Sequence, residues 1–175
     1  VEELRFVECV VAISCLCMPL LNTSYADANL TTIEDGALAD SLVAYWSFNG
    51  NANDSSGNGH NGVVVGAALT ADRNGAENKA YWFDGTNDYI WAANDGTLCP
   101  TSFTFSAWIR VDRVGQQSGA LMGVQENYKG YGFACGQAWG NDVLAMVGDG
   151  GIWRGSFYTQ TPGIWSFYAL TLDAN

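Results

Sequence analysis

Residues 102–111 carry an apolar side chain at every second position, from Phe103 to Val111. That period is the spacing of a β-strand with one face buried and one face turned to solvent, and it is incompatible with a helical stripe. The segment therefore predicts a half-buried strand. One face carries Phe103, Phe105, Ala107, Ile109 and Val111, all apolar, and the other carries Thr104, Ser106, Trp108 and Arg110.

Further segments rich in β-branched and aromatic residues follow at short spacing, separated by turn-forming residues. The chain has 21 Gly and only 3 Pro in 175 residues, and no long segment shows a helical period. This length suits one domain with its own core. The pattern predicts an all-β fold, an antiparallel β-sandwich of the jelly-roll type. Strands are expected at residues 42–48, 63–65, 80–83, 88–91, 102–111, 119–124, 131–135, 143–147, 153–158 and 165–172.

The sequence between two of these segments looks like a tight turn. Residues 80–83 and 88–91 are separated by Asp84-Gly85-Thr86-Asn87, and Asp-Gly is a strong signal for reversing the chain. We therefore predict a hairpin-like pair whose two strands meet at residues 85–87.

The formal charge of the chain is −11, with a pI near 4.1. Phosphate backbones are bound by clustered Lys and Arg, so this balance excludes nucleic acid as the expected partner. An acidic surface suits solubility outside the cell, and it also suits loops that hold hard cations.

The first residues differ in composition from the rest. Residues 7–21 are almost all apolar, which at about fifteen residues is short for a membrane span, and Ser24-Tyr25-Ala26 offers small residues at a cleavage site. We expect residues 1–26 to be a secretory signal peptide and residues 27–41 to be a linker. The mature chain is then secreted or displayed at the cell surface, with no membrane span. Acylation of Cys15 or Cys17 as a lipoprotein is the less favoured alternative.

Export leaves two cysteines in the mature chain, Cys99 and Cys135. An oxidising compartment permits one disulfide between them. The sequence leaves two alternatives open, a Cys99–Cys135 bridge or two buried thiols.

Three segments together resemble a known family. They are Leu42-Val43-Ala44-Tyr45-Trp46-Ser47-Phe48-Asn49-Gly50 with its continuation to Gly59, residues 80–90, and Phe103-Thr104-Phe105-Ser106-Ala107-Trp108-Ile109. They are similar to the laminin-G-like jelly-roll group of the concanavalin A-like lectin/glucanase superfamily. The resemblance runs over residues 42–175 and implies a domain that is incomplete at its C-terminus, because the family's next strand, with a Tyr-x-Asn-Gly-type motif, is absent. This fold hosts lectins, adhesion modules and enzymes.

Catalysis is not expected. A glycosidase needs two carboxyl groups at a defined separation, and the mature chain has only Glu34, Glu77 and Glu126, in none of the patterns of the related glucanases. His60 is the only histidine and lies in an Asn/Gly loop without a nucleophile signature.

Calcium is the expected cofactor, because it takes oxygens from carboxylates, amides and carbonyls. Asp54 and Asn58 lie in the Asn/Gly loop, and Asp84 and Asn87 form a second group. The alternative is that these residues serve only as turn formers. By resemblance to pentraxins, Glu126 and Asn127 fall where that group binds calcium.

Sugar rings stack on exposed aromatic side chains. Four aromatic residues lie near predicted loops or strand ends and are the candidate ligand contacts, although core packing is the common role of such residues. The chain is thus expected to be a non-catalytic binding module for carbohydrate or a surface glycoprotein. The alternatives are a protein-binding adhesion module and the accessory module of a secreted glycoside hydrolase. The candidate ligand contacts are Trp91, Tyr128, Trp139 and Trp153.

Overall fold

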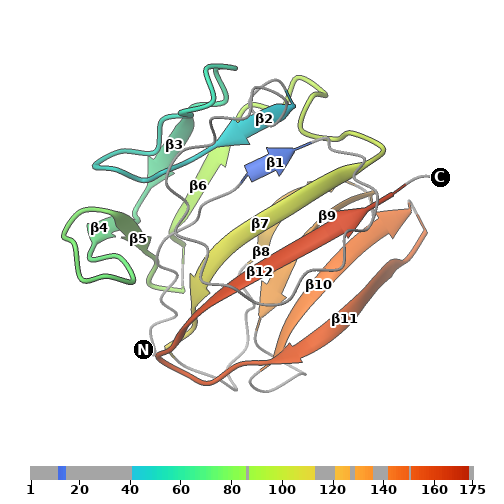
Figure 1. The fold of residues 1–175 in the computed structure, drawn as a ribbon. Helices are drawn as coiled ribbons and strands as arrows, with labels where there is room; N and C mark the ends of the chain where they lie inside the picture. The colour runs from blue at the N-terminus through green and yellow to red at the C-terminus, as the bar shows by residue number, and fades with distance from the viewer. Residues whose placement is uncertain are drawn as a thin grey trace, which may run out of the picture.

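The computed structural model describes residues 12–14, 41–85, 87–112, 121–126, 129–135, 142–149 and 151–173. Within these ranges every regular element is a strand, and no helix is long and apolar enough to cross a membrane. The fold is an antiparallel β-sandwich with two principal sheets, as the sequence predicts (Figure 1).

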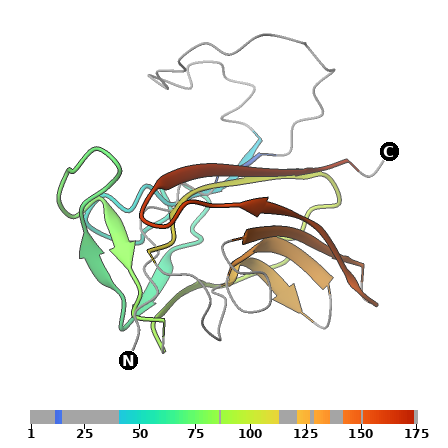
Figure 2. The ribbon, with the colours of Figure 1, turned by 90° about the horizontal axis from the view of Figure 1, so that it is seen from below.

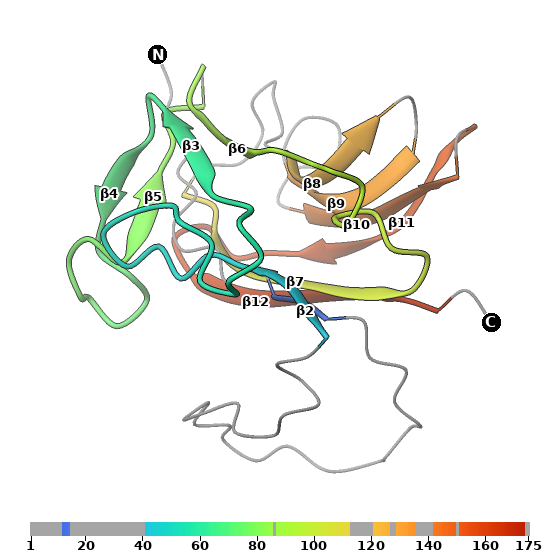
Figure 3. The same cartoon turned by 90° about the horizontal axis from the view of Figure 1, so that it is seen from above.

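The first sheet has the order β12-β7-β1-β2 and the second has the order β11-β10-β9-β8. Figure 2 and Figure 3 show the two sheets facing each other as layers, with two shorter strand pairs, β3–β6 and β4–β5, at one end. The first sheet consists of β12 (Trp165–Leu172), β7 (Phe103–Arg110), β1 (Ala12–Ser14) and β2 (Leu42–Tyr45). The second consists of β11 (Trp153–Thr159), β10 (Asp142–Asp149), β9 (Lys129–Cys135) and β8 (Leu121–Glu126). The short pairs are β3 (Gly62–Val65) with β6 (Tyr89–Ala92), and β4 (Ala68–Thr70) with β5 (Ala80–Trp82).

The core lies between the two principal sheets and is built from aromatic rings. Phe105 of β7 stacks on Phe133 of β9 with ring centroids 5.0 Å apart, and Phe103 meets Tyr131 at 4.2 Å. Phe133 also contacts Tyr168 of β12 at 5.8 Å. These rings come from the apolar faces of their strands, so the predicted buried face of β7 is confirmed.

The predicted hairpin at residues 85–87 is wrong. β5 pairs with β4, with Ala68 opposite Trp82, and β6 pairs with β3, with Gly62 opposite Ala92. Asp84 and Asp88 instead organise the connection, because the backbone N–H of Asp84 donates to Asp88 Oδ2 at 3.0 Å. The chain turns here without making its two flanking strands partners.

The strand predicted at residues 42–48 ends earlier, at Tyr45. Trp46 forms an isolated bridge with Asp54, and Phe48 has a φ of 48°, which no strand residue adopts. The loop that follows is therefore folded back against β2.

Part of the predicted signal peptide enters the sheet. Ala12–Ser14 forms β1 between β2 and β7, while the rest of residues 1–26 and the linker up to residue 40 lie outside the described ranges.

Candidate functional site

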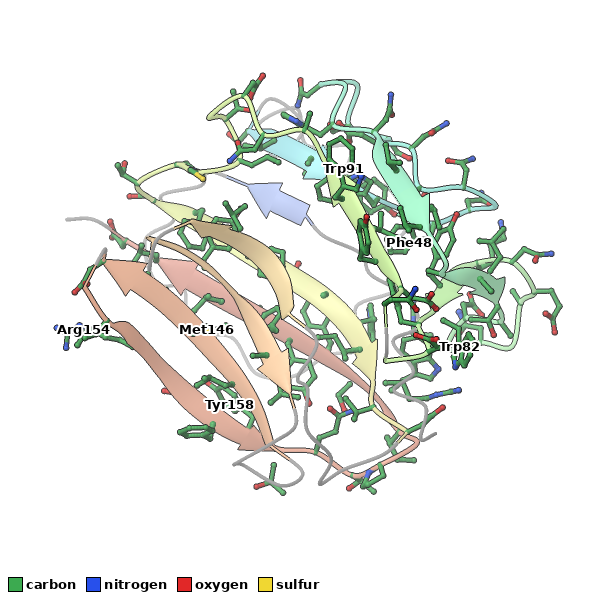
Figure 4. The ribbon with its side chains drawn as sticks, turned by 180° about the vertical axis from the view of Figure 1, so that it is seen from behind. Phe48, Trp82, Trp91, Met146, Arg154 and Tyr158 are labelled. Carbon is green, nitrogen blue, oxygen red and sulfur yellow. The ribbon has the colours of Figure 1, made fainter. Side chains whose placement is uncertain are left out.

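The outer face of the β3–β6 pair carries an exposed apolar group, which we call the aromatic patch: Val63, Tyr89 and Trp91. These side chains are 48%, 51% and 50% exposed. Trp91 lies directly opposite Val63 across the pair. Tyr89 lies two residues before Trp91 on the same face, roughly 7 Å along the strand. Figure 4 shows Trp91 at this end of the molecule.

The patch is exposed because its strands alternate. Val64 and Ile90 point to the other side and pack against the core, so the residues between them face solvent. A contiguous set of exposed aromatic side chains on a rigid strand pair is a typical ligand surface. The sequence singled out Trp91 correctly as a surface residue, but missed Tyr89. Because side chains two residues apart on a strand share a face, the position of Trp91 would have predicted that Tyr89 is exposed beside it.

The Asn/Gly loop of residues 49–61 holds the adjoining end of this pair in place. Asp54 accepts several of the hydrogen bonds that order this loop. Its Oδ1 accepts the backbone N–H groups of Tyr45 at 3.0 Å and Ser56 at 2.9 Å. Its Oδ2 accepts the N–H of His60 at 3.0 Å. Partial burial acts to raise the pKa of Asp54, but the hydrogen bonds from Ser56, Tyr45 and His60 outweigh it and lower that pKa.

His60 ties this loop to the segment after β6. The ring is only 5% exposed; its Nδ1 lies 3.3 Å from the carbonyl of Ala93 and its Nε2 lies 2.9 Å from Thr97 Oγ1. Thr97 Oγ1 in turn donates to Asp95 at 2.6 Å. His60 thus fastens the end of the β3–β6 pair at which Gly62 lies opposite Ala92.

The residues predicted to bind calcium make protein contacts. Asn58 donates its amide to the carbonyls of Leu42 at 2.7 Å and Val43 at 2.9 Å, and Asp84 Oδ1 accepts the N–H of Asn87 at 3.4 Å. In the part of the chain that the structure describes, no three His, Cys, Asp or Glu side chains gather closely enough to hold a metal ion. Both oxygens of Asp54 accept backbone N–H groups, so this carboxylate has a structural role in the loop whether or not an ion is bound.

Several predicted site residues cannot be placed. Tyr128, Trp139 and Asn127 lie outside the described residues. Trp153 and Glu126 are described by their backbone only, as the first residue of β11 and the last residue of β8.

Neither of the two alternatives left open for Cys99 holds: it forms no bridge with Cys135 and its free thiol is exposed, not buried. Asn94 donates to its Sγ at 3.4 Å. The neighbouring carbonyl of Leu98 accepts the Tyr131 hydroxyl at 2.7 Å, which sets Cys99 near the Tyr131 level of β9. Cys135, the last residue of β9, lies four residues beyond Tyr131 on that strand.

No curated protein and no solved structure matches the chain. A family model described as the concanavalin A-like lectin/glucanases superfamily, Laminin_G_3, matches residues 84–175. This match covers the second principal sheet and strands β7 and β12 of the first, and it agrees with the jelly-roll architecture of the strands. The chain therefore belongs to the laminin-G-like group of the concanavalin A-like lectin/glucanase superfamily.

Proposed function

We propose that the chain is a secreted, non-catalytic module that binds carbohydrate, free or on a surface glycoprotein, through the aromatic patch. The family is one of binding modules in general. The observation that carries the proposal is the exposure of Trp91 and Tyr89 side by side on the rigid β3–β6 pair. Export is supported by the apolar leader and the small residues before Asp27.

The chemistry of the patch suits a sugar ring. The flat faces of two aromatic side chains offer apolar area for the C–H face of a ring. Val63 extends that apolar area opposite Trp91. The nearest acidic group along the strand, Asp88, is adjacent to Tyr89, and the chain is strongly acidic overall. Charge repulsion therefore favours neutral glycans over sulfated or uronic ones.

A glycan array on the secreted protein tests the proposal. Trp91→Ala and Tyr89→Ala are expected to abolish the signal without unfolding the protein, because both side chains are half exposed. Tyr158→Ala is the matched control, since Tyr158 is 51% exposed but lies on β11, far from Trp91 in Figure 4. Unchanged glycan binding in Trp91→Ala would remove the patch from the proposal.

Calcium dependence is measured in the same experiment. The array is run with calcium and then with EDTA. If glycan binding is lost in EDTA and restored by calcium, the binding depends on calcium, as the sequence predicts. If glycan binding persists in EDTA, it does not depend on calcium.

One observation favours protein recognition as a second function. Large apolar side chains are exposed on and beside β11 and β12, away from the patch, and such groups commonly mark protein contacts. If the array is silent and a surface protein binds, Tyr158→Ala is expected to weaken that binding and Trp91→Ala to leave it unchanged. These exposed residues are Ile152, Phe157, Tyr158, Ile164 and Phe167.

A further inference from the structure

The sequence has four asparagines that are followed directly by glycine. Asparagine is a thermolabile residue, because the backbone nitrogen of the next residue can attack its carboxamide carbon. Glycine has no Cβ to hinder that approach. All four asparagines are exposed, so exposure does not distinguish them. The four pairs are Asn49-Gly50, Asn58-Gly59, Asn61-Gly62 and Asn74-Gly75.

In three of the pairs the backbone N–H of the glycine is held in a hydrogen bond. The attacking nitrogen must first lose its proton to solvent, so a bonded N–H has to open before the reaction can begin. These three pairs are therefore protected by the fold. The bonds run from Gly50 to the carbonyls of Phe48 and Asn78, both at 2.8 Å, from Gly62 to Ala52 at 2.7 Å, and from Gly75 to Asp72 at 3.0 Å.

The N–H of Gly59 differs from the other three. Within the described part of the chain, no protein group accepts it. Gly59 is exposed, and a Cβ built on it would meet no atom within 4 Å. The N–H groups on both sides are bonded, that of Asn58 to Ser56 Oγ at 3.2 Å and that of His60 to Asp54 Oδ2 at 3.0 Å. The open position in this loop is therefore the nitrogen that would react.

The carboxamide of Asn58 ties its loop to β2. Its Nδ2 donates to the carbonyls of Leu42 at 2.7 Å and Val43 at 2.9 Å. A carboxylate at this position would have no hydrogen to donate, and it would place a negative oxygen against two carbonyl oxygens. Losing both bonds and opposing these dipoles is unfavourable. Loss of the amide at Asn58 therefore detaches the loop from β2.

We propose that Asn58 is the site at which the folded protein deamidates spontaneously, and that this modification releases the loop of residues 49–61 from β2. Solvent base removes the N–H proton of Gly59, and the nitrogen lone pair forms a bond to Asn58 Cγ. The Cγ–Nδ2 bond breaks, and Nδ2 takes a proton from water and leaves as ammonia. The product is a five-membered cyclic imide.

One water molecule then opens the imide. Cleavage of the new Cγ–N bond gives aspartate, and cleavage of the original peptide bond gives isoaspartate. In both cases the net change is that the amide and one water become a carboxyl group and ammonia. The step needs no enzyme and no reactant besides water. Because it is irreversible, its extent records the time that the folded protein has spent in solution.

Peptide mapping of the aged protein tests the site. The full chain is kept folded at mildly alkaline pH in heavy-oxygen water, and the oxygen gained by each asparagine is measured by mass spectrometry. Asn58 should react at least roughly fivefold faster than the other three asparagines, the factor that one ordinary hydrogen bond on the glycine N–H contributes. Equal rates at the four positions, or a faster rate at any of the other three, would overturn the proposal.

The same measurement in urea shows whether the fold causes the selectivity. Once the chain is unfolded, all four glycine N–H groups are open to solvent, and the four rates should converge. A preference for Asn58 that persists in urea would assign the selectivity to the local sequence and contradict the proposal.

Two variants test the release of the loop. Asn58→Asp introduces the carboxylate of one product and is expected to lower the melting temperature. Asn74→Asp is the matched control, because it adds the same charge in another exposed loop, where the hydrogen bond described at Asn74 is made by its backbone N–H to Asp72 at 2.8 Å. Its melting temperature should stay close to that of wild type. Equal melting temperatures in the two variants would overturn the release.

Aged wild-type protein gives the same comparison if Asn58→Asp does not fold. The modified fraction, separated by anion exchange, should melt below the unmodified fraction. Identical melting of the two fractions would contradict the release. None of these measurements uses a ligand, so their outcome is independent of the proposed glycan binding.

Discussion

Val63 and Trp91 lie directly opposite each other across the β3–β6 pair, and about half of each side chain is exposed. Because of this pairing, a ligand that stacks on Trp91 also lies close to Val63. The pairing also gives a position at which the chemistry of the aromatic patch can be changed without touching either aromatic ring.

Val63→Asp should weaken glycan binding at least roughly tenfold, which corresponds to about 1.4 kcal/mol. A sugar ring stacked on Trp91 would strip water from the new carboxylate, and desolvating an unpaired charge is unfavourable. Isothermal titration of wild type and variant with the best array ligand measures the change. Val63→Thr is the control, because it has nearly the same shape and no charge, and it should bind almost normally. Equal loss in both variants would point to distortion of β3.

Asp54 should make the stability of the domain depend on pH in the acid range. Its folded pKa is lowered, below the ordinary value of 3.8. The stabilisation is therefore fully present above the unfolded pKa, near 4, and is lost as the pH falls through the folded pKa. Urea unfolding from about pH 7 down to about pH 2.5 measures it.

Asp54→Asn is the matching variant. It keeps one oxygen but places an amide N–H₂ among N–H donors, so it should reduce the free energy of unfolding by about 2 kcal/mol at neutral pH. The difference from wild type should shrink in acid, where the wild-type carboxyl is itself protonated. A difference that stays constant with pH would show that the charge of Asp54 does not matter.

The sequence predicted best where a strand is long and alternates. β12 begins and ends where the pattern predicts, at Trp165 and Leu172, and the buried face of β7 is the predicted one. Period-two alternation reports burial directly, because each face of a strand meets a different environment. Trp91 was predicted for a different reason, its place near a strand end, and it is exposed on the solvent face of β6.

Strand pairing could not be predicted in the same way. Asp84-Gly85 carries a strong local turn signal, yet the partners of β5 and β6 are set by distant segments. β4 has only three residues, too few to show a period. Calcium loops and tight turns use the same residue types, so the sequence could not predict how Asp54 is bonded within its loop. The hydrogen bonds from Tyr45, Ser56 and His60 to Asp54 are known only from the structure, and calcium binding by this residue stays a prediction.

Gly123→Ala should strongly destabilise the second sheet. Gly123 has a φ of +146°, and an added Cβ would lie 2.0 Å from the carbonyl oxygen of Tyr131 and 2.6 Å from the Cα of Gly132. Both contacts are to the backbone of β9, which cannot move aside without breaking its ladder. We expect a loss of at least about 2 kcal/mol in urea unfolding.

Gly151→Ala is the matched control for that substitution. The nearest atom to its added Cβ is Asp149 Oδ1 at 3.5 Å, an ordinary contact. Its effect should stay within about 0.5 kcal/mol. Similar losses at both positions would mean that the close approach of β8 and β9 at Gly123 is relieved by movement of the strands.

Tyr131→Phe tests the link between the core and the loop that carries Cys99. The Tyr131 ring is 2% exposed and packs on Phe103 and Phe105, and its hydroxyl donates to the carbonyl of Leu98 at 2.7 Å. Burial, and next to it the neighbouring Cys99, raises the pKa of Tyr131, so the hydroxyl stays a donor throughout the working range of pH. Removing it leaves the ring packing intact but leaves the Leu98 carbonyl without this donor. We expect a loss of about 1–2 kcal/mol in urea unfolding.

The same variant should loosen the loop at Cys99 without opening the core. Alkylation of Cys99, which is already exposed, should become faster in Tyr131→Phe, because the Leu98 carbonyl is one residue away and no longer held. Phe103→Leu, which removes the ring contact with Tyr131 but keeps the hydrogen bond, is the control and should lower stability without changing the alkylation rate of the folded protein. Faster alkylation in both variants would mean that global unfolding, not release of Leu98, exposes the thiol.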